Sequence, residues 1–187
     1  MPGAVYLEGE GLVLRTIEED DLEFLRDTIN DPAVRRHLPN RLPLNLEGER
    51  EFYEDVIVGD DDTLNLLIWQ AADGESDGRR AGTIGVHGLG SIDGTSEIGL
   101  FLEPGSWGRG LGTEASRLVT DWAFREQGRH RVIARVTESN DASAAIWEKL
   151  GYRHEATLRE AGFQDGEYVD EHLYAVLEDE WRGAPDG

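Results

Sequence analysis

Three glycines stand at alternate positions, Gly108, Gly110 and Gly112, between an apolar segment and a helical one in SEIGLFLEPGSWGRGLGTEASRLVTDWAF. Glycine permits backbone conformations that bring consecutive N–H groups close to a bound group, and a helix N-terminus favours negative charge. Such a loop can hold a phosphate through main-chain donors alone. We therefore expect an anion cradle here, with an ordinary glycine-rich turn as the alternative.

Two known anion-binding patterns can be compared with this loop. The run GLGTEA, from Gly110 to Ala115, satisfies G-x-G-x-x-A, the fingerprint of an NAD(P)-dependent oxidoreductase. The context argues against that class, because the loop follows an antiparallel meander, and Glu138 lies late for a ribose-binding acid. A P-loop is excluded because no Gly-Lys-Ser/Thr follows the glycines.

A second group of polar residues lies on the predicted helix NDASAAIWEKL. Asn140, Ser143 and Trp147 are spaced i, i+3 and i+7, so they share one face of that helix. Ile146 and Leu150 lie partly to the side, toward the expected core.

The elements that must position these groups alternate between helical and extended patterns. LVLR predicts a strand at 12–15, and a Thr16/Glu19 capping box begins a helix with an apolar face at Leu22, Leu25 and Ile29. A second helix over 45–57 has Asn45 as its N-cap. Its predicted buried face includes Phe52 and Val56.

The remaining segments predict a mainly antiparallel sheet. TLNLLIWQAA, AGTIGVHGL and TSEIGLFLE are separated by Asp- and Gly-rich stretches typical of hairpins. A helix over 113–126 carries Ala115, Leu118, Val119 and Trp122 on one face. It is followed by a strand at 131–138, the helix 140–150 with Gly151 after its end, and a hairpin of strands 152–160 and 168–177.

Length and composition restrict the class of protein. The 187 residues fit a single domain over 1–187, with a core at about 12–181 and a frayed tail at 182–187. The chain has no cysteine, and its five histidines lack metal-ligand spacing, so we expect no metal. Neither a signal peptide nor a membrane span is indicated, which predicts a cytoplasmic protein.

Charge restricts the partners. The chain has 39 acidic and 18 basic residues, a net charge of -21, and Lys149 is its only lysine. Such a field disfavours nucleic acid and anionic membranes and favours cationic partners. It would also suit a cytoplasm of high ionic strength, where charges are screened, so we interpret the chain as halophilic-like.

Over about 12–181 the chain resembles the GNAT family of N-acetyltransferases, most closely its RimJ/RimL-like branch. LVLRTIEEDDLEFL is similar to that branch's first strand and helix, SEIGLFLEPGSWGRGLGTEA to its fourth strand and pyrophosphate loop, and the segment from Asn140 to Trp181 to its closing elements. Trp107 occupies the first position of the loop motif, as is common in this branch. The resemblance implies an α/β (α+β) fold whose mixed, mostly antiparallel central sheet has helices on both faces and is splayed at an acetyl-CoA site.

By this resemblance the cosubstrate is acetyl-CoA. Its pyrophosphate would lie on the N–H groups of the loop, and its pantetheine would pair like an extra strand with the fourth strand. Asn140, Ser143 and Trp147 would also line the cofactor site. The loop and strand residues implied are Leu100, Phe101, Leu102, Trp107, Gly108, Arg109, Gly110, Leu111, Gly112 and Thr113.

The resemblance also suggests catalytic residues. Many family members have a tyrosine at the position of Trp147 that protonates the leaving thiolate, and an indole N–H cannot replace that acid. Ser143 is the substitute we expect, with packing or capping as the alternative role. Glu97 is the expected base for the acceptor ammonium, acting through water, with a plain surface carboxylate as the alternative role. A backbone N–H near Leu100 or Phe101 would meet the oxyanion.

Several features of the reaction stay open. The acceptor would be an amine, and the negative charge favours a cationic one: the N-terminal α-amine of a ribosomal protein, a small amine or a polyamine. His87, Asp170 and Glu171 are weaker candidates for its site. A non-catalytic acyl-CoA-binding sensor and an NAD(P)-dependent oxidoreductase are the alternative functions. A homodimer is the commonest closed assembly.

Overall fold

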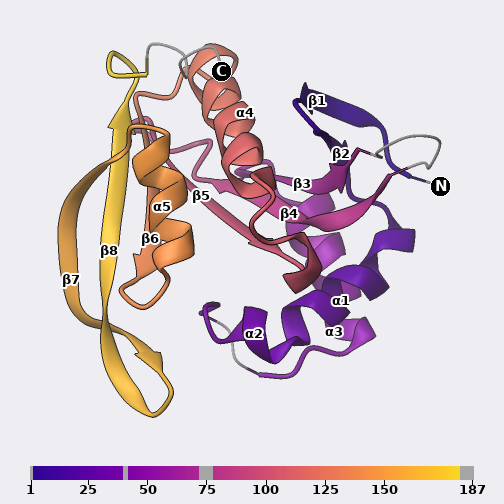
Figure 1. The fold of residues 1–187 in the computed structure, drawn as a ribbon. Helices are drawn as coiled ribbons and strands as arrows, with labels where there is room; N and C mark the ends of the chain where they lie inside the picture. Colours follow the sequence, from indigo (N-terminus) through magenta and orange to yellow (C-terminus); the bar gives the residue numbers. More distant parts are fainter. Residues whose placement is uncertain (1, 40–41, 72–77, 182–187) are drawn as a thin grey trace.

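The computed structural model of the chain describes residues 2–39, 42–71 and 78–181, which form one eight-stranded sheet with helices against it (Figure 1). The strand order in the sheet is β1-β2-β3-β4-β5-β6-β8-β7. The strands are β1 Val5–Gly9, β2 Leu12–Thr16, β3 Thr63–Gln70, β4 Arg79–His87, β5 Thr95–Leu102, β6 Arg131–Thr137, β7 Arg153–Gln164 and β8 Glu167–Leu177.

The sheet is antiparallel except at one place, as the sequence predicted. β3, β4 and β5 form the expected meander, with Leu67 opposite Thr83 and Thr83 opposite Phe101. β5 and β6 are parallel and pair only from Thr95 to Glu97. Beyond Glu97 the register between them ends, so the two strands splay apart toward their C-terminal ends.

Helices cover both faces of the sheet (Figure 1). On one face, α4 and α5 pack over a large core that includes Leu66 and Ile68 of β3. On the other face, α1 and the segment after α3 pack against Leu67, which alternates with those two residues. The helices are α1 Leu22–Asn30, α2 Pro32–Arg35, α3 Leu46–Phe52, α4 Leu111–Arg125 and α5 Asp141–Lys149.

The predicted apolar face of α4 is confirmed. Ala115, Val119 and Trp122 are buried in the larger core, and the fourth predicted residue, Leu118, is half-buried against it. The helix begins two residues earlier than predicted, because Gly110 takes a left-handed conformation, with φ of 79°, as its N-cap.

The N-terminal segment differs from the prediction. β1 was not predicted, and its pairing with β2 redirects the hydroxyl of Thr16, which accepts a hydrogen bond from Ala4 N at 2.9 Å. The capping box therefore forms between Glu18 and Asp21, around the 3-10 turn Glu19–Asp21, instead of between Thr16 and Glu19. α2 was also not predicted.

The predicted N-cap of α3 is confirmed, but the buried face of the helix differs from the prediction. The side chain of Asn45 accepts a hydrogen bond from Gly48 N at 2.8 Å. Phe52 is 43% exposed instead of buried, because the chain continues as a π-helix at Tyr53–Val58 and turns Tyr53 and Ile57 inward. The buried residue of α3 is Glu49.

The last hairpin is longer than predicted, since β7 and β8 reach a two-residue turn at Asp165 and Gly166. A bulge between Leu158 and Gly162 shifts the register of β7. The predicted tail at 182–187 lies outside the described residues. So does most of the Asp- and Gly-rich stretch 73–80, which joins two strands of the meander. No helix in the described ranges is long and apolar enough to cross a membrane.

Candidate active site

The splay between β5 and β6 leaves part of β5 without a neighbouring strand on one side. Glu103 N, directly after β5, donates to Ala81 O of β4 at 2.8 Å. Because backbone groups alternate along a strand, the N–H and C=O groups of Leu102 and Leu100 point away from β4, toward the splay. The carbonyl of Leu102 accepts a hydrogen bond from the indole N–H of Trp107 at 2.9 Å. β5 thus presents main-chain donors and acceptors inside the sheet.

The glycine loop has the backbone shape that an anion cradle needs. Gly108 and Gly110 have φ of 70° and 79°, and a Cβ on either would meet nothing within 4 Å. Their requirement is therefore conformational, and the space beside them is open. The first intrahelical bond of this end runs from Glu114 N to Gly110 O, at 3.0 Å, and no side chain caps the helix. The N–H groups of Leu111, Gly112 and Thr113 are left without helical partners.

Gly112 has a different role from the other two glycines. A Cβ at this position would lie 2.9 Å from Ile146 Cδ1 of α5 and 3.3 Å from Leu100 Cδ1 of β5. The absence of a side chain therefore lets α4, α5 and β5 meet closely beside the splay. The contacts therefore support a packing role for Gly112.

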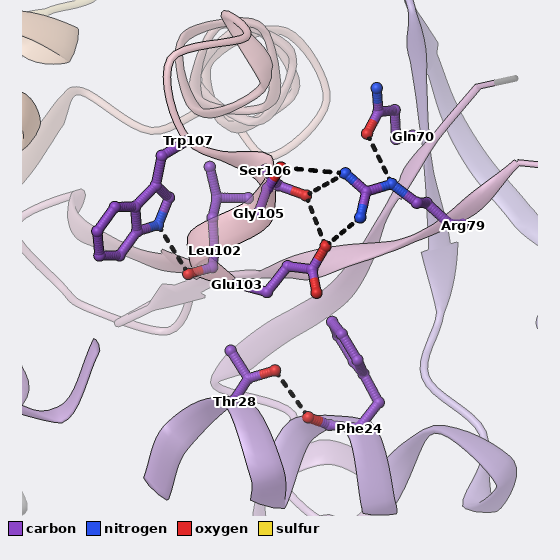
Figure 2. A network of polar contacts seen from close by, with 9 residues as sticks. All are labelled: Phe24, Thr28, Gln70, Arg79, Leu102, Glu103, Gly105, Ser106 and Trp107. Atoms are coloured by element: carbon purple, nitrogen blue, oxygen red, sulfur yellow. Dashed lines mark hydrogen bonds and ion pairs between the residues drawn. The ribbon is translucent and has the colours of Figure 1, made fainter. Parts of the chain in front are cut away.

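A polar network fixes the entrance to the loop (Figure 2). The guanidinium of Arg79 pairs with the carboxylate of Glu103, and its Nη2 donates to Gly105 O and to Ser106 Oγ, both at 3.2 Å. The hydroxyl of Ser106 in turn donates to Glu103 Oε1 at 3.0 Å. These bonds tie the 3-10 turn Pro104–Ser106 to the start of β4. The position of the loop is thereby coupled to the rigid meander.

A cavity of about 420 Å³ opens next to the start of α4. Its lining includes the loop residues Arg109 and Gly110 and residues of the β1–β2 turn and the end of β3. It also includes Lys149 at the end of α5, which the sequence reasoning did not assign to the site. The only sequence signal for it was that Lys149 is the sole lysine.

α5 begins at the open end of β6 and positions Ser143. Asn140 is its N-cap, and the side-chain oxygen accepts from Ser143 N at 3.2 Å. Ser143 is therefore not the cap, which excludes one of the alternatives considered for it. Its side chain is half-buried, and no described residue forms a hydrogen bond with its hydroxyl.

Trp147 does not line an open cleft, contrary to expectation. Its side chain is 1% exposed and packs against Tyr152, with ring centroids 5.0 Å apart. The indole N–H is buried and has no hydrogen-bond partner within the described residues. Trp147 is thus a core residue in this structure, and its expected contact with the cofactor stays a prediction.

Glu97 lies where the splay begins. Ile98 belongs to the core under α4, so Glu97 points to the opposite face, the one that α1 covers. Arg135 of β6 points to the same face, and its Nε lies 3.5 Å from a Glu97 carboxylate oxygen. His87 is opposite Glu97 in the register of β4 and is exposed.

On that face the hairpin tip of β7 and β8 approaches α2. Arg36 pairs with Asp165 at 2.8 Å. Gln164 and Thr137 lie nearby, and the buried atoms Gln164 Nε2 and Thr137 Oγ1 have no hydrogen-bond partner in the described part of the chain.

Asp170 has a structural role in the hairpin. Its carboxylate accepts from Glu160 N at 2.8 Å, and its carbonyl accepts from Glu138 N at 2.9 Å. These bonds hold the bulge of β7 and give Asp170 a structural role. Glu171 lies opposite Thr137 in β8 and is half-buried.

The fold and the site together define an acyl-CoA-type transferase architecture: a mixed sheet splayed at two parallel strands, with an uncapped helix N-terminus beside the opening. A family model described as an acetyltransferase (GNAT) domain matches residues 11–153. The chain belongs to this GNAT acetyltransferase family and is an acetyl-CoA-dependent N-acetyltransferase. The oxidoreductase alternative is therefore wrong, in agreement with a sheet that is not a parallel one.

Relatives and solved structures agree with this assignment. The uncharacterized N-acetyltransferase YoaA of Bacillus subtilis is 32% identical over 182 residues, which is 91% of this chain and 96% of YoaA. Alignments with some other curated relatives from that bacterium span only about half of their length. One of them is YdaF, named as a candidate ribosomal N-acetyltransferase, which is 31% identical over 57% of this chain and 58% of its own.

The fold is matched by a crystal structure of spermidine N-acetyltransferase from Vibrio cholerae in complex with CoA and spermine. Its TM-score is 0.83 at 19% identity, and the match covers 91% of this chain and 98% of that one. At this identity the comparison shows the shared fold.

Proposed function

We propose that the chain transfers the acetyl group of acetyl-CoA directly to a primary amine in a ternary complex. The observation that carries the proposal is the uncapped start of α4, with Gly108 and Gly110 at positive φ and open space beside them. The pyrophosphate would be bound by the N–H groups from Trp107 to Thr113. The pantetheine arm would pair with the groups of Leu100 and Leu102 that face the splay.

In the proposed reaction the amine nitrogen forms a bond to the thioester carbonyl carbon, and the carbon–sulfur bond breaks. Glu97 accepts the proton of the acceptor ammonium through water before attack. Ser143 then donates its hydroxyl proton to the leaving thiolate and regains a proton from the newly acylated nitrogen, which becomes the neutral amide. Both residues border the splay, Glu97 from β5 and Ser143 from the first turn of α5. A thiolate leaves without much assistance, since free thiols have a pKa near 8.5, so Ser143 supplies a modest part of the rate.

We infer that the acceptor is a cationic amine and that the chain belongs to the RimJ/RimL-like branch. The N-terminal α-amine of a ribosomal protein is the first candidate, supported by the resemblance in sequence and by the name of YdaF. A polyamine is the second, favoured by the net charge of -21 and by the ligand of the Vibrio cholerae structure.

Calorimetric titration of the folded protein in molar KCl tests the binding part of this proposal. We expect saturable binding of acetyl-CoA and none of NADPH. Release of free thiol should then be measured with basic peptides and with spermidine. Binding of acetyl-CoA without thiol release with any amine would indicate the acyl-CoA sensor instead.

Replacing Ser143 by alanine is expected to lower kcat by about tenfold to a hundredfold and to leave the Kd for acetyl-CoA unchanged. The reason is that a proton donor acts on the leaving thiolate, which exists only after attack. Thiol-release kinetics and calorimetry measure the two quantities. Equal losses in kcat and in affinity for acetyl-CoA would mean that Ser143 only binds the cosubstrate.

Glu97→Gln is expected to lower the rate at pH 7 by about a hundredfold and to recover much of it as the pH rises. An α-amine has a pKa of about 8 and a lysine amine of about 10, so at high pH the acceptor loses its proton without a base. The measurement is the pH profile of kcat/KM for wild type and variant. A loss that is constant with pH would mean that Glu97 only positions Arg135.

A further inference from the structure

The cavity beside the start of α4 contains two cations that the protein itself does not neutralise. Most arginines in the described part of the chain pair with carboxylates: Arg26, Arg36, Arg50, Arg79, Arg80, Arg117, Arg125, Arg131, Arg135 and Arg153. Arg109 and Lys149, which both line the cavity, form no ion pair or hydrogen bond with any described side chain.

Two acidic side chains, Glu10 and Glu114, also line the cavity, and Glu114 is paired with a cation, so Arg109 and Lys149 face one remaining carboxylate. Glu114 is held by Arg117, through hydrogen bonds of 2.7 and 2.9 Å, and also accepts from Glu10 N at 3.0 Å. Its charge is therefore compensated within its own helix. In a chain of net charge -21, a pocket with two unpaired cations is a local exception, and it favours an anion.

Lys149 approaches the loop because of the packing between α4 and α5. Ile146 is the residue of α5 that would contact a Cβ on Gly112. Lys149 lies three residues further along α5, so it shares that side of the helix and extends past the start of α4. Its long aliphatic stem carries the ammonium to the cavity beside the loop.

We propose that Lys149, assisted by Arg109, binds the ribose 3′-phosphate of acetyl-CoA and makes the enzyme discriminate CoA from 3′-dephospho-CoA. The inference rests on the proposed function, in which the main-chain N–H groups of the loop bind the pyrophosphate. The 3′-phosphate is the remaining anionic group of CoA. Two side-chain cations next to the loop suit a phosphate monoester, which carries more charge than each phosphate of the pyrophosphate.

The test measures Kd for CoA and for 3′-dephospho-CoA by calorimetry, at about 0.15 M salt, where long-range surface effects are screened beyond about 8 Å. The proteins are wild type, Lys149→Gln, Lys149→Arg and, as control, Arg159→Gln. Arg159 is exposed, lies on β7 outside this cavity and has no ion pair within the described residues. The control removes the same charge from the chain.

Wild type should bind CoA at least about tenfold more tightly than 3′-dephospho-CoA. Lys149→Gln should lose about tenfold for CoA and less than about twofold for 3′-dephospho-CoA. Lys149→Arg should retain the preference, and Arg159→Gln should behave as wild type.

Equal weakening of both ligands in Lys149→Gln, or no change in either, would overturn the assignment while leaving the cradle intact. If Arg159→Gln lost as much affinity for CoA as Lys149→Gln, the effect would come from the net charge of the chain, and the assignment of Lys149 to the 3′-phosphate would be wrong. Failure of wild type to bind both ligands would instead contradict the proposed function itself, and the assignment with it.

Discussion

Gly110→Val is expected to weaken acetyl-CoA binding by more than about a hundredfold in a protein that still folds. Gly110 has φ of 79°, which a β-branched residue adopts only with strain of about 1–3 kcal/mol. The loop would relax into another conformation, and the N–H groups of the cradle would no longer converge. Calorimetry with acetyl-CoA measures the loss, and thermal unfolding measures the strain.

Gly128→Val is the matched control. Gly128 also has positive φ, at 60°, with nothing within 4 Å of a Cβ, but it lies in the turn after α4. Both variants should lose similar stability, and only Gly110→Val should lose affinity. If Gly128→Val lost the same affinity, strain in the fold would explain the effect, and the cradle would not.

Glu49→Gln is expected to raise the free energy of unfolding at pH 8 by about 2 kcal/mol and to change it little at pH 5. Glu49 is 2% exposed, and one of its carboxylate oxygens has no hydrogen-bond partner in the described ranges. Burial raises the pKa of Glu49 from 4.5 to about 7, against a smaller opposing effect of Arg26.

Between pH 4.5 and about pH 7, Glu49 of the folded chain holds a proton that the unfolded chain has released. Stability contributed by this group is therefore present below about pH 4.5 and is lost as the pH rises through 7. Glutamine resembles the protonated form and removes that loss. Urea unfolding at both pH values gives the difference, with the exposed Glu51→Gln as control. A destabilised variant at pH 8 would show instead that the buried carboxylate has a cationic partner.

The features predicted best from the sequence are those that local pattern determines. The meander and the buried face of α4 follow from apolar spacing, and the Asn45 cap follows from the residue type. β1 was missed because its residues are mostly exposed, so only its pairing with β2 defines it. That same pairing redirects Thr16 and moves the capping box to Glu18, a tertiary effect that residue types alone do not reveal.

The site shows the same division. The sequence alone indicates positive φ at Gly108 and Gly110, because few other residues tolerate that conformation. Helical spacing correctly placed Ser143 near Trp147, but it does not say where the core ends around a helix, and Trp147 falls inside it. Lys149 reaches the loop only through the packing of Ile146 near Gly112, which requires the folded chain.

The part of β5 that has no partner strand on one side lies in the interior of the sheet, because β5 is not an edge strand. An exposed outer strand can recruit another protein chain, which is a route to aggregation. Here β4 on one side and β6 on the other leave the outward backbone groups of Leu100 and the N–H of Leu102 within the splay, while the Leu102 carbonyl is bonded to Trp107. A thin amide-bearing arm can enter that width, whereas a full strand with side chains on both faces cannot. The fold therefore keeps unsatisfied backbone available to a ligand while protecting the chain from self-association through it.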